Sequence, residues 1–303
     1  MSLRTPTNLM NRQALLDLQR TKERISVLQE QIATGKRIVR LSDDPTGSAL
    51  ILDFQNSIAR NHEFLRQAEA AGSFLSGAES ALGSLNDALT RLLEIGQEGL
   101  TGTSGATGRA ALGEETDGLR SSILSIANTQ EQGKYLFAGT ATLTQPFSGP
   151  PAGPITYAGN AGLINLEVSP THLATTNLPG GSLFFGPGGQ GSATDVFQAV
   201  TDLRDGLRTN NVALIQTAVT NLEAIHARVN QSITDLGGRQ ATLLQVRDTL
   251  EGFNLNLQSI LNSEQDLDYP SAIMDFSTEQ TAQQATLATL AKSGQRNLFD
   301  YLG

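Results

Sequence analysis

Apolar side chains recur every three or four residues over most of this sequence. In the first 40 residues five of them form a series that, with Thr21 at its third position, has alternating steps of four and three: Ala14, Leu18, Ile25, Leu28 and Ile32. These steps place the side chains on one face of a helix, as in a coiled coil. Similar patterns fill residues 51–92, 112–126 and 212–261, and a last amphipathic stretch covers 276–299. The periodicity predicts a mainly α protein, an elongated rod of long antiparallel helices with a helical bundle.

The composition narrows the classes of function. The chain has no Cys, which excludes disulfides, thiolate metal sites and cysteine nucleophiles. It also has no Trp and only 5% aromatic residues, which disfavours a thick sandwich or barrel core. The formal net charge of -9 argues against nucleic-acid binding, which needs a basic surface.

Two acidic, proline-containing segments interrupt the helical pattern near the ends, TGKRIVRLSDDPTGSAL at 34–50 and SEQDLDYPSAI at 263–273. A calcium loop would need alternating oxygen ligands and a distal Glu, which the first segment lacks. Ser42 or Asp43 can cap the following helix, and Pro45 fits its first turn. We therefore interpret both segments as joints between helices, with these residues in structural roles: Gly35, Asp43, Asp44, Pro45, Gly47 and Pro270.

Residues 136–195 differ from the rest of the chain. They contain seven of the ten prolines and the strand-like pieces PITYAG, LINLEV and SLFFG. We expect a small β domain inserted between helical segments. The predicted organisation is an N-terminal helix (1–42), a first helical part (43–135), the β insert (136–195), a second helical part (196–263) and a C-terminal helix (264–303) that pairs with the first.

The two terminal helices carry opposite charge. Residues 1–40 hold eight Lys and Arg against three Asp and Glu, whereas residues 262–303 hold two against six. Two thin helices can cover each other's apolar stripe but form little core. We therefore expect both ends to be assembly elements that neighbouring copies bury. The predicted interface combines the N-terminal series named above with Leu287, Leu290, Leu298 and Phe299.

No pattern in the sequence predicts catalysis, a cofactor or a bound metal. His62, His172 and His226 lack ligand spacing, and the run GPGGQGSATD at 186–195 lacks the Lys-Ser/Thr of a phosphate loop. The first residues show no signal-peptide pattern. No stretch approaches the roughly 18 apolar residues of a membrane span, so we expect no membrane insertion.

The stretch LQEQIATGKRIVRLSDDPTGSAL resembles the N-terminal signature of the bacterial flagellin superfamily. The C-terminal stretch from LNSEQDLDYPSAI to NLFDYLG is similar to the C-terminal signature of the same group. Within the superfamily, GKYLFAGTATLTQPF at 133–147 and the ending NLFDYLG resemble the hook-filament junction branch. Two signatures in the right order, at opposite ends of the chain, are more specific than either one.

The resemblance implies a structural adaptor of the flagellum. Such proteins leave the cell unfolded through the flagellar type III export channel and assemble outside it, at the hook-filament junction. The implied partners are identical subunits in a ring, a hook-side junction protein, flagellin and an export chaperone. The alternative is flagellin, the filament subunit itself.

Overall fold

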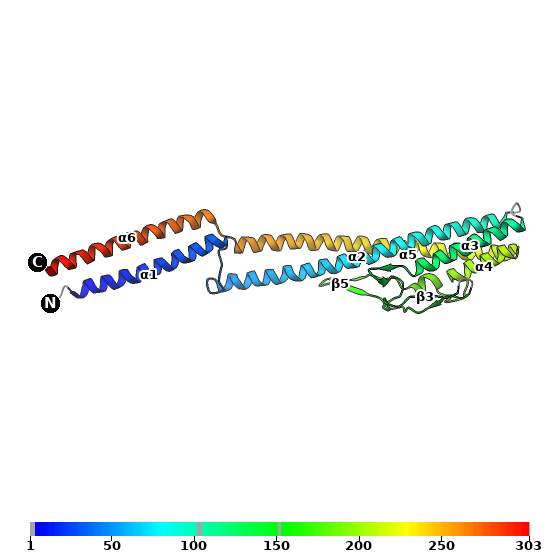
Figure 1. Cartoon of the computed structure of the whole chain (residues 1–303), viewed down its shortest axis with the longest axis horizontal. Helices are drawn as coiled ribbons and strands as arrows, with labels where there is room; N and C mark the ends of the chain where they lie inside the picture. Colours follow the sequence, from blue (N-terminus) through cyan, green and yellow to red (C-terminus); the bar gives the residue numbers. More distant parts are fainter. Residues whose placement is uncertain (1–3, 102–104, 151–152, 303) are drawn as a thin grey trace. The chain divides into compact units, whose positions relative to one another are not determined.

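The computed structural model describes residues 4–101, 105–150 and 153–302, without the side chains of residues 4–8, 10–11 and 293–302. The chain divides into two compact units. The terminal unit comprises residues 1–60 and 253–303, and the central unit comprises residues 61–252. Two long helices, α2 (Pro45–Leu100) and α5 (Val212–Gln265), contribute residues to both units (Figure 1).

The terminal unit is built around a pair of antiparallel helices, α1 (Arg4–Thr34) and α6 (Tyr269–Leu302), which lie side by side (Figure 1). The alternating steps of four and three turn the apolar residues of α1 toward α6. Ile25 lies on this seam and is buried. The first turns of α2 and the last turns of α5 complete the unit.

The central unit has a continuous hydrophobic core. Leu82, Leu85, Leu89 and Leu92 follow one face of α2 at helical spacing and are fully buried. They share this core with α5 and with two shorter helices that pack on each other, α3 (Ala106–Ala127) and α4 (Val196–Arg208). Asp195 is the N-cap of α4, and its Oδ1 accepts hydrogen bonds from the N–H groups of Phe197 and Gln198.

The strands between α3 and α4 form three separate antiparallel hairpins. Their bounds are β1 (Gln130–Glu131) with β2 (Lys134–Tyr135), β3 (Phe147–Ser148) with β4 (Thr156–Tyr157), and β5 (Asn165–Ser169) with β6 (His172–Thr175). The β5–β6 pair contains a bulge between Glu167 and Ser169. Phe137, Phe147 and Phe184 of this region are buried in the same cluster as the helices.

One local expectation is wrong. The piece SLFFG is a turn of π-helix, η1 (Gly181–Phe185), instead of a strand. Its apolar run buries neighbouring side chains together, and the ring of Phe184 lies 4.9 Å from that of Phe147. The third helical stretch ends at Ala127, shortly before the β1–β2 hairpin begins at Gln130. Helix α5 is continuous through the Gly237–Gly238 pair.

Candidate functional site in the terminal unit

The seam between α1 and α6 is only partly closed. Ile25 is 9% exposed, while Ala14, Leu18, Leu28 and Ile32 of α1 and Leu290 of α6 are half-buried. Leu287 is 48% exposed. Leu298 and Phe299 belong to the last turns of α6, but their side chains lie outside the described residues. The two helices therefore leave much of the predicted apolar surface accessible.

The two predicted joints meet in space through their main chains. Lys36 and Asp266 form an antiparallel bridge. The Arg37 N–H donates to the Gln265 carbonyl at 2.8 Å, and the Leu267 N–H donates to the Gly35 carbonyl at 3.0 Å. Segments more than 200 residues apart in sequence are thus joined where α1 ends and α6 begins.

Gly35 makes this junction possible because it ends α1 in a left-handed conformation, with φ of +70°. Its N–H donates to the Gln31 carbonyl at 2.8 Å, which completes the last turn of the helix. A Cβ at this position would lie 2.8 Å from the Oη of Tyr269, the first residue of α6. Glycine therefore satisfies both the turn and the close approach of α6.

Arg37 connects the two joints through its side chain, a role that the sequence analysis missed. Its Nε and Nη2 donate to the Glu264 carbonyl at 3.2 and 3.0 Å, and Nη2 also lies 3.3 Å from Glu264 Oε2. Its Nη1 lies 3.5 Å from Asp44 Oδ2. The Arg37 side chain is 46% exposed, so these ion pairs add little beyond the main-chain bridge.

The second helix is capped one residue later than expected. The cap is Asp44 and not Ser42 or Asp43, because Asp44 Oδ1 accepts a hydrogen bond from the Gly47 N–H at 2.9 Å. Asp43 instead accepts from the Arg40 N–H at 3.0 Å and closes the preceding turn. Pro45 is the first residue of α2, a position where its missing N–H costs nothing.

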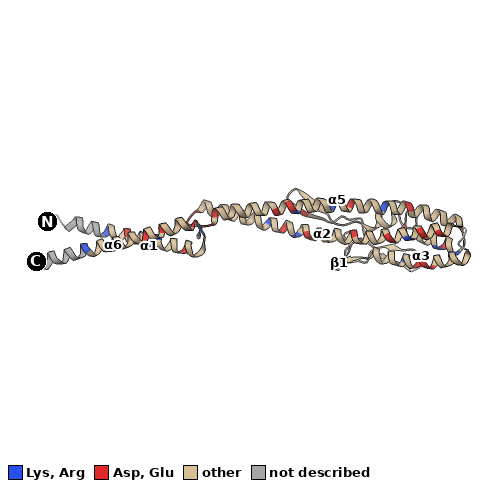
Figure 2. Ribbon diagram, turned by 90° about the horizontal axis from the view of Figure 1, so that it is seen from above, with Lys and Arg blue, Asp and Glu red and all other residues tan. Residues whose placement is uncertain are grey.

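The remaining joint residues also have identifiable places. A Cβ at Gly47 would lie 2.6 Å from Ile38 Cδ1, so glycine leaves room for this buried side chain. Pro270 is the second residue of α6. Charged residues of both signs gather around this junction (Figure 2).

The terminal unit carries many exposed apolar side chains and lies outside the buried core cluster. The buried core cluster runs from Ala68 to Leu243 and lies entirely in the central unit. Most of the described exposed large apolar side chains instead belong to the terminal unit: Leu9, Leu15, Leu16, Val27, Leu41, Leu50, Leu52, Phe253, Leu255, Ile260, Tyr269, Ile273, Met274 and Leu287. Exposed apolar surface of this extent is typical of interaction sites.

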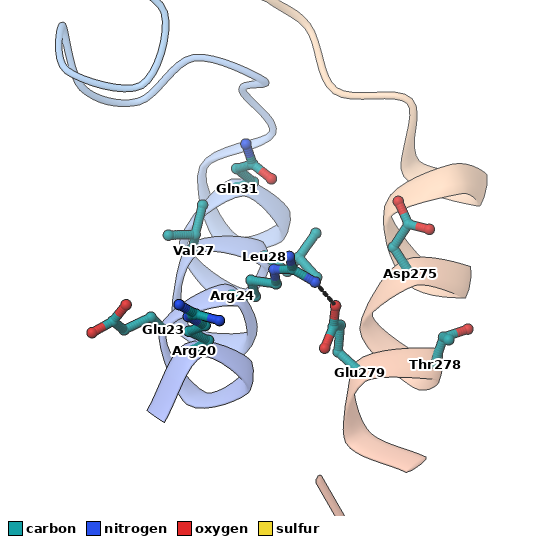
Figure 3. A pocket seen from close by; sticks show the side chains of 9 residues that line it. All are labelled: Arg20, Glu23, Arg24, Val27, Leu28, Gln31, Asp275, Thr278 and Glu279. Atoms are coloured by element: carbon teal, nitrogen blue, oxygen red, sulfur yellow. Dashed lines mark hydrogen bonds and ion pairs between the residues drawn. The ribbon is translucent and has the colours of Figure 1, made fainter. Parts of the chain in front are cut away.

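An open groove of about 590 Å³ runs between α1 and α6 (Figure 3). Arg20, Arg24 and Val27 line it from α1, and Asp275 and Glu279 line it from α6. One ion pair crosses the groove, from Arg24 Nη1 to Glu279 Oε1 at 3.0 Å.

The described residues contain no group of three or more His, Asp or Glu side chains that could hold a metal ion. Within the same part of the chain, no helix is long and apolar enough to cross a membrane.

Comparison with known proteins agrees with this description. Residues 6–142 match the family model for the bacterial flagellin N-terminal helical region. The flagellar hook-associated protein 3 of Escherichia coli (strain K12) is 26% identical, over 98% of this chain and 99% of the relative. Its counterpart from Salmonella typhimurium is 24% identical over the same shares. A flagellin of Halalkalibacterium halodurans is 25% identical, over 88% of this chain and 87% of the relative.

Solved structures show the same fold. A flagellar hook-associated protein of Vibrio parahaemolyticus gives a TM-score of 0.68 at 22% identity, covering 74% of this chain and 100% of that one. A flagellar hook-associated protein 3 of Legionella pneumophila gives 0.63 at 16% identity, covering 70% and 98%. The predicted mainly α fold, with long helices and small β elements, is confirmed. The chain is similar, over nearly its whole length, to flagellar hook-associated protein 3, and its residues 6–142 match the model of the bacterial flagellin N-terminal region.

Proposed function

We propose that this protein is a structural adaptor of the bacterial flagellum, which joins a hook-side junction protein to the flagellin filament. The observation that carries the proposal is the similarity to hook-associated protein 3 over 98% of the chain. The match to flagellin covers less of the chain, 88%. The relatives are structural flagellar proteins, and the proposal assigns no reaction to the chain.

In this proposal the terminal unit is the assembly element. The apolar residues of the α1–α6 seam would become fully buried when identical subunits pack around a ring. The seam residues are Ala14, Leu18, Ile25, Leu28 and Ile32 in α1, and Leu287, Leu290, Leu298 and Phe299 in α6. The half-open seam and the exposed apolar side chains of the terminal unit support this role.

The joint would set the direction in which the terminal helices leave α2 and α5. Gly35, Asp43, Asp44, Pro45, Gly47 and Pro270 would act structurally, by capping and turning the chain. The protein would be exported unfolded, escorted by a chaperone inside the cell, and would reach the outside of the cell at the hook-filament junction. Terminal helices that form little core are suited to that passage.

The test is to locate the protein on intact flagella. A short epitope inserted between Pro170 and Thr171 would lie in the exposed turn of the β5–β6 hairpin. Immunogold electron microscopy is expected to show a narrow band where the hook meets the filament. The same epitope placed in the flagellin of those cells should label the whole filament, which controls for antibody access.

Other distributions would contradict the proposal. Label along the entire filament would identify the chain as a flagellin. Label retained in the cell, with flagella unlabelled although the flagellin control is decorated, would remove the chain from the flagellum altogether.

A further inference from the structure

The groove between α1 and α6 carries an excess of negative charge that its own helices do not neutralise. Three carboxylates, Glu23, Asp275 and Glu279, line it together with two guanidinium groups, Arg20 and Arg24. Arg24 pairs with Glu279 across the groove at 3.0 Å. Arg20 lies 3.7 Å from Asp17 of its own helix.

Of the two groove acids on α6, Asp275 is the one that Arg24 does not pair with. It is exposed, and within the described part of the chain no ion pair to it is recorded. Across the groove, on α1, Leu28 is half-buried and points toward α6 (Figure 3). The groove thus offers an apolar side chain on one wall and a carboxylate on the other, which fits the methylene stem and ammonium group of a lysine.

The same chain presents such a lysine on a different face. Lys22 is exposed, and in the described part of the structure no ion pair to it is recorded. At 3.6 residues per turn, Lys22 lies roughly 160° around α1 from Arg20 and Arg24, beyond the seam that contains Ile25. Leu15, seven residues earlier on the same face, is 53% exposed. This face therefore combines a free positive charge with exposed apolar surface.

We propose that the groove receives Lys22 from a second copy of this chain, with its methylene stem over Leu28 and its ammonium group against Asp275. The proposal deepens the proposed function, because it names one contact through which terminal units would assemble. Donor and acceptor lie on different faces of one molecule, so the contact is heterologous. A heterologous contact repeats from copy to copy and builds a ring or tube instead of stopping at a dimer.

The absence of cysteine from the chain permits a direct test on assembled flagella. The double variant Lys22→Cys/Asp275→Cys places thiols on the two proposed partners. The two thiols cannot form a disulfide within one molecule. Arg24 and Glu279 are in contact, and along the helix axes Lys22 lies on one side of this contact and Asp275 on the other. A disulfide needs Cα atoms within about 7 Å of each other. Mild oxidation is expected to give a ladder of dimers, trimers and larger multimers.

Matched variants make the ladder specific. Lys22→Cys combined with Asp53→Cys, an exposed acid of α2, should give no ladder. Each single cysteine variant should give no band above the dimer. A missing ladder from Lys22→Cys/Asp275→Cys would overturn the proposal, as would a product whose mass contains flagellin or a hook-side protein.

Charge reversal provides an independent readout. Lys22→Asp and Asp275→Lys should each reduce incorporation, and combining them should restore it, because the pair is exchanged. A double variant no better than the single ones would also overturn the contact. The epitope at Pro170–Thr171 distinguishes failure of this contact from failure of the proposed function. Label at the junction without a ladder rejects this contact alone, whereas absence of the protein from flagella rejects the proposed function as well.

Discussion

Gly35 meets two structural requirements, one of backbone conformation and one of space. Its φ of +70° favours glycine, and its missing side chain leaves space for the Tyr269 hydroxyl. We predict that Gly35→Ala weakens the joint by about 1–2 kcal/mol, the usual cost of a left-handed residue with a Cβ. Hydrogen exchange of peptides that contain the Arg37 and Leu267 amides should accelerate by roughly tenfold.

The two causes can be separated with a second substitution. Tyr269→Phe removes the Oη that the new Cβ would meet at 2.8 Å, but it leaves the backbone conformation unchanged. Adding it to Gly35→Ala should recover part of the lost protection and no more. Exchange in Gly35→Ala equal to that of the unmodified protein would show that this turn is not under the constraint described.

At the scale of elements, the glycines of the long helices lie in two kinds of surroundings, open and closely packed. A Cβ at Gly237 or Gly238 of α5 would meet nothing within 4 Å. A Cβ at Gly96 of α2 would overlap Cγ2 of Val219. The same substitution should therefore have opposite effects at these positions.

We predict that Gly237→Ala and Gly238→Ala each raise the free energy of unfolding of the central unit by about 0.4–1 kcal/mol, through helix propensity and a less flexible unfolded chain. Gly96→Ala should lower it by about 1–3 kcal/mol through overpacking. Denaturant unfolding followed by circular dichroism would measure all three. A stabilising Gly96→Ala, or destabilising changes in α5, would contradict the packing described.

The seam of α1 provides the second prediction at this scale. Leu28→Asp places a carboxylate among the half-buried apolar residues between α1 and α6, and incorporation into flagella should fall at least about tenfold, which corresponds to about 1.4 kcal/mol. Leu290→Asp should act in the same way. Leu244→Asp is the control, since Leu244 is 51% exposed in the central unit. Unchanged incorporation of Leu28→Asp would refute the role of the seam.

The local sequence pattern was sufficient to predict some of these elements and insufficient to predict others. The spacing of Leu82, Leu85, Leu89 and Leu92 predicts a buried helix face because helical period is a local property. The apolar run SLFFG does not distinguish a strand from a buried helical turn. The pairing of residues 35–37 with 265–267 could not be predicted in detail, since it depends on main-chain contacts between segments far apart in sequence.

At the scale of the whole molecule, the apolar core is unevenly distributed. The central unit holds the buried cluster, whereas the terminal unit holds most of the described exposed apolar side chains. Since burial of apolar surface is the main favourable contribution to folding, the terminal unit should open at a lower free-energy cost than the central unit. An assembly protein gains from this difference, because the surface that is weak in the free chain is the surface that its neighbours bury.

Limited proteolysis of the free, full-length protein tests this difference. Trypsin should cut at Arg20 and Arg24 of α1, which are 69% and 71% exposed, well before it cuts at Arg91 of α2, which is 44% exposed in the packed central unit. Mass spectrometry should find a lasting fragment bounded near Arg60 and Arg247. In intact flagella the sites in α1 should become protected. Resistance of α1 to cleavage in the dilute free protein would mean that the terminal unit is ordered without neighbouring copies. It would contradict a role for its exposed apolar residues in assembly.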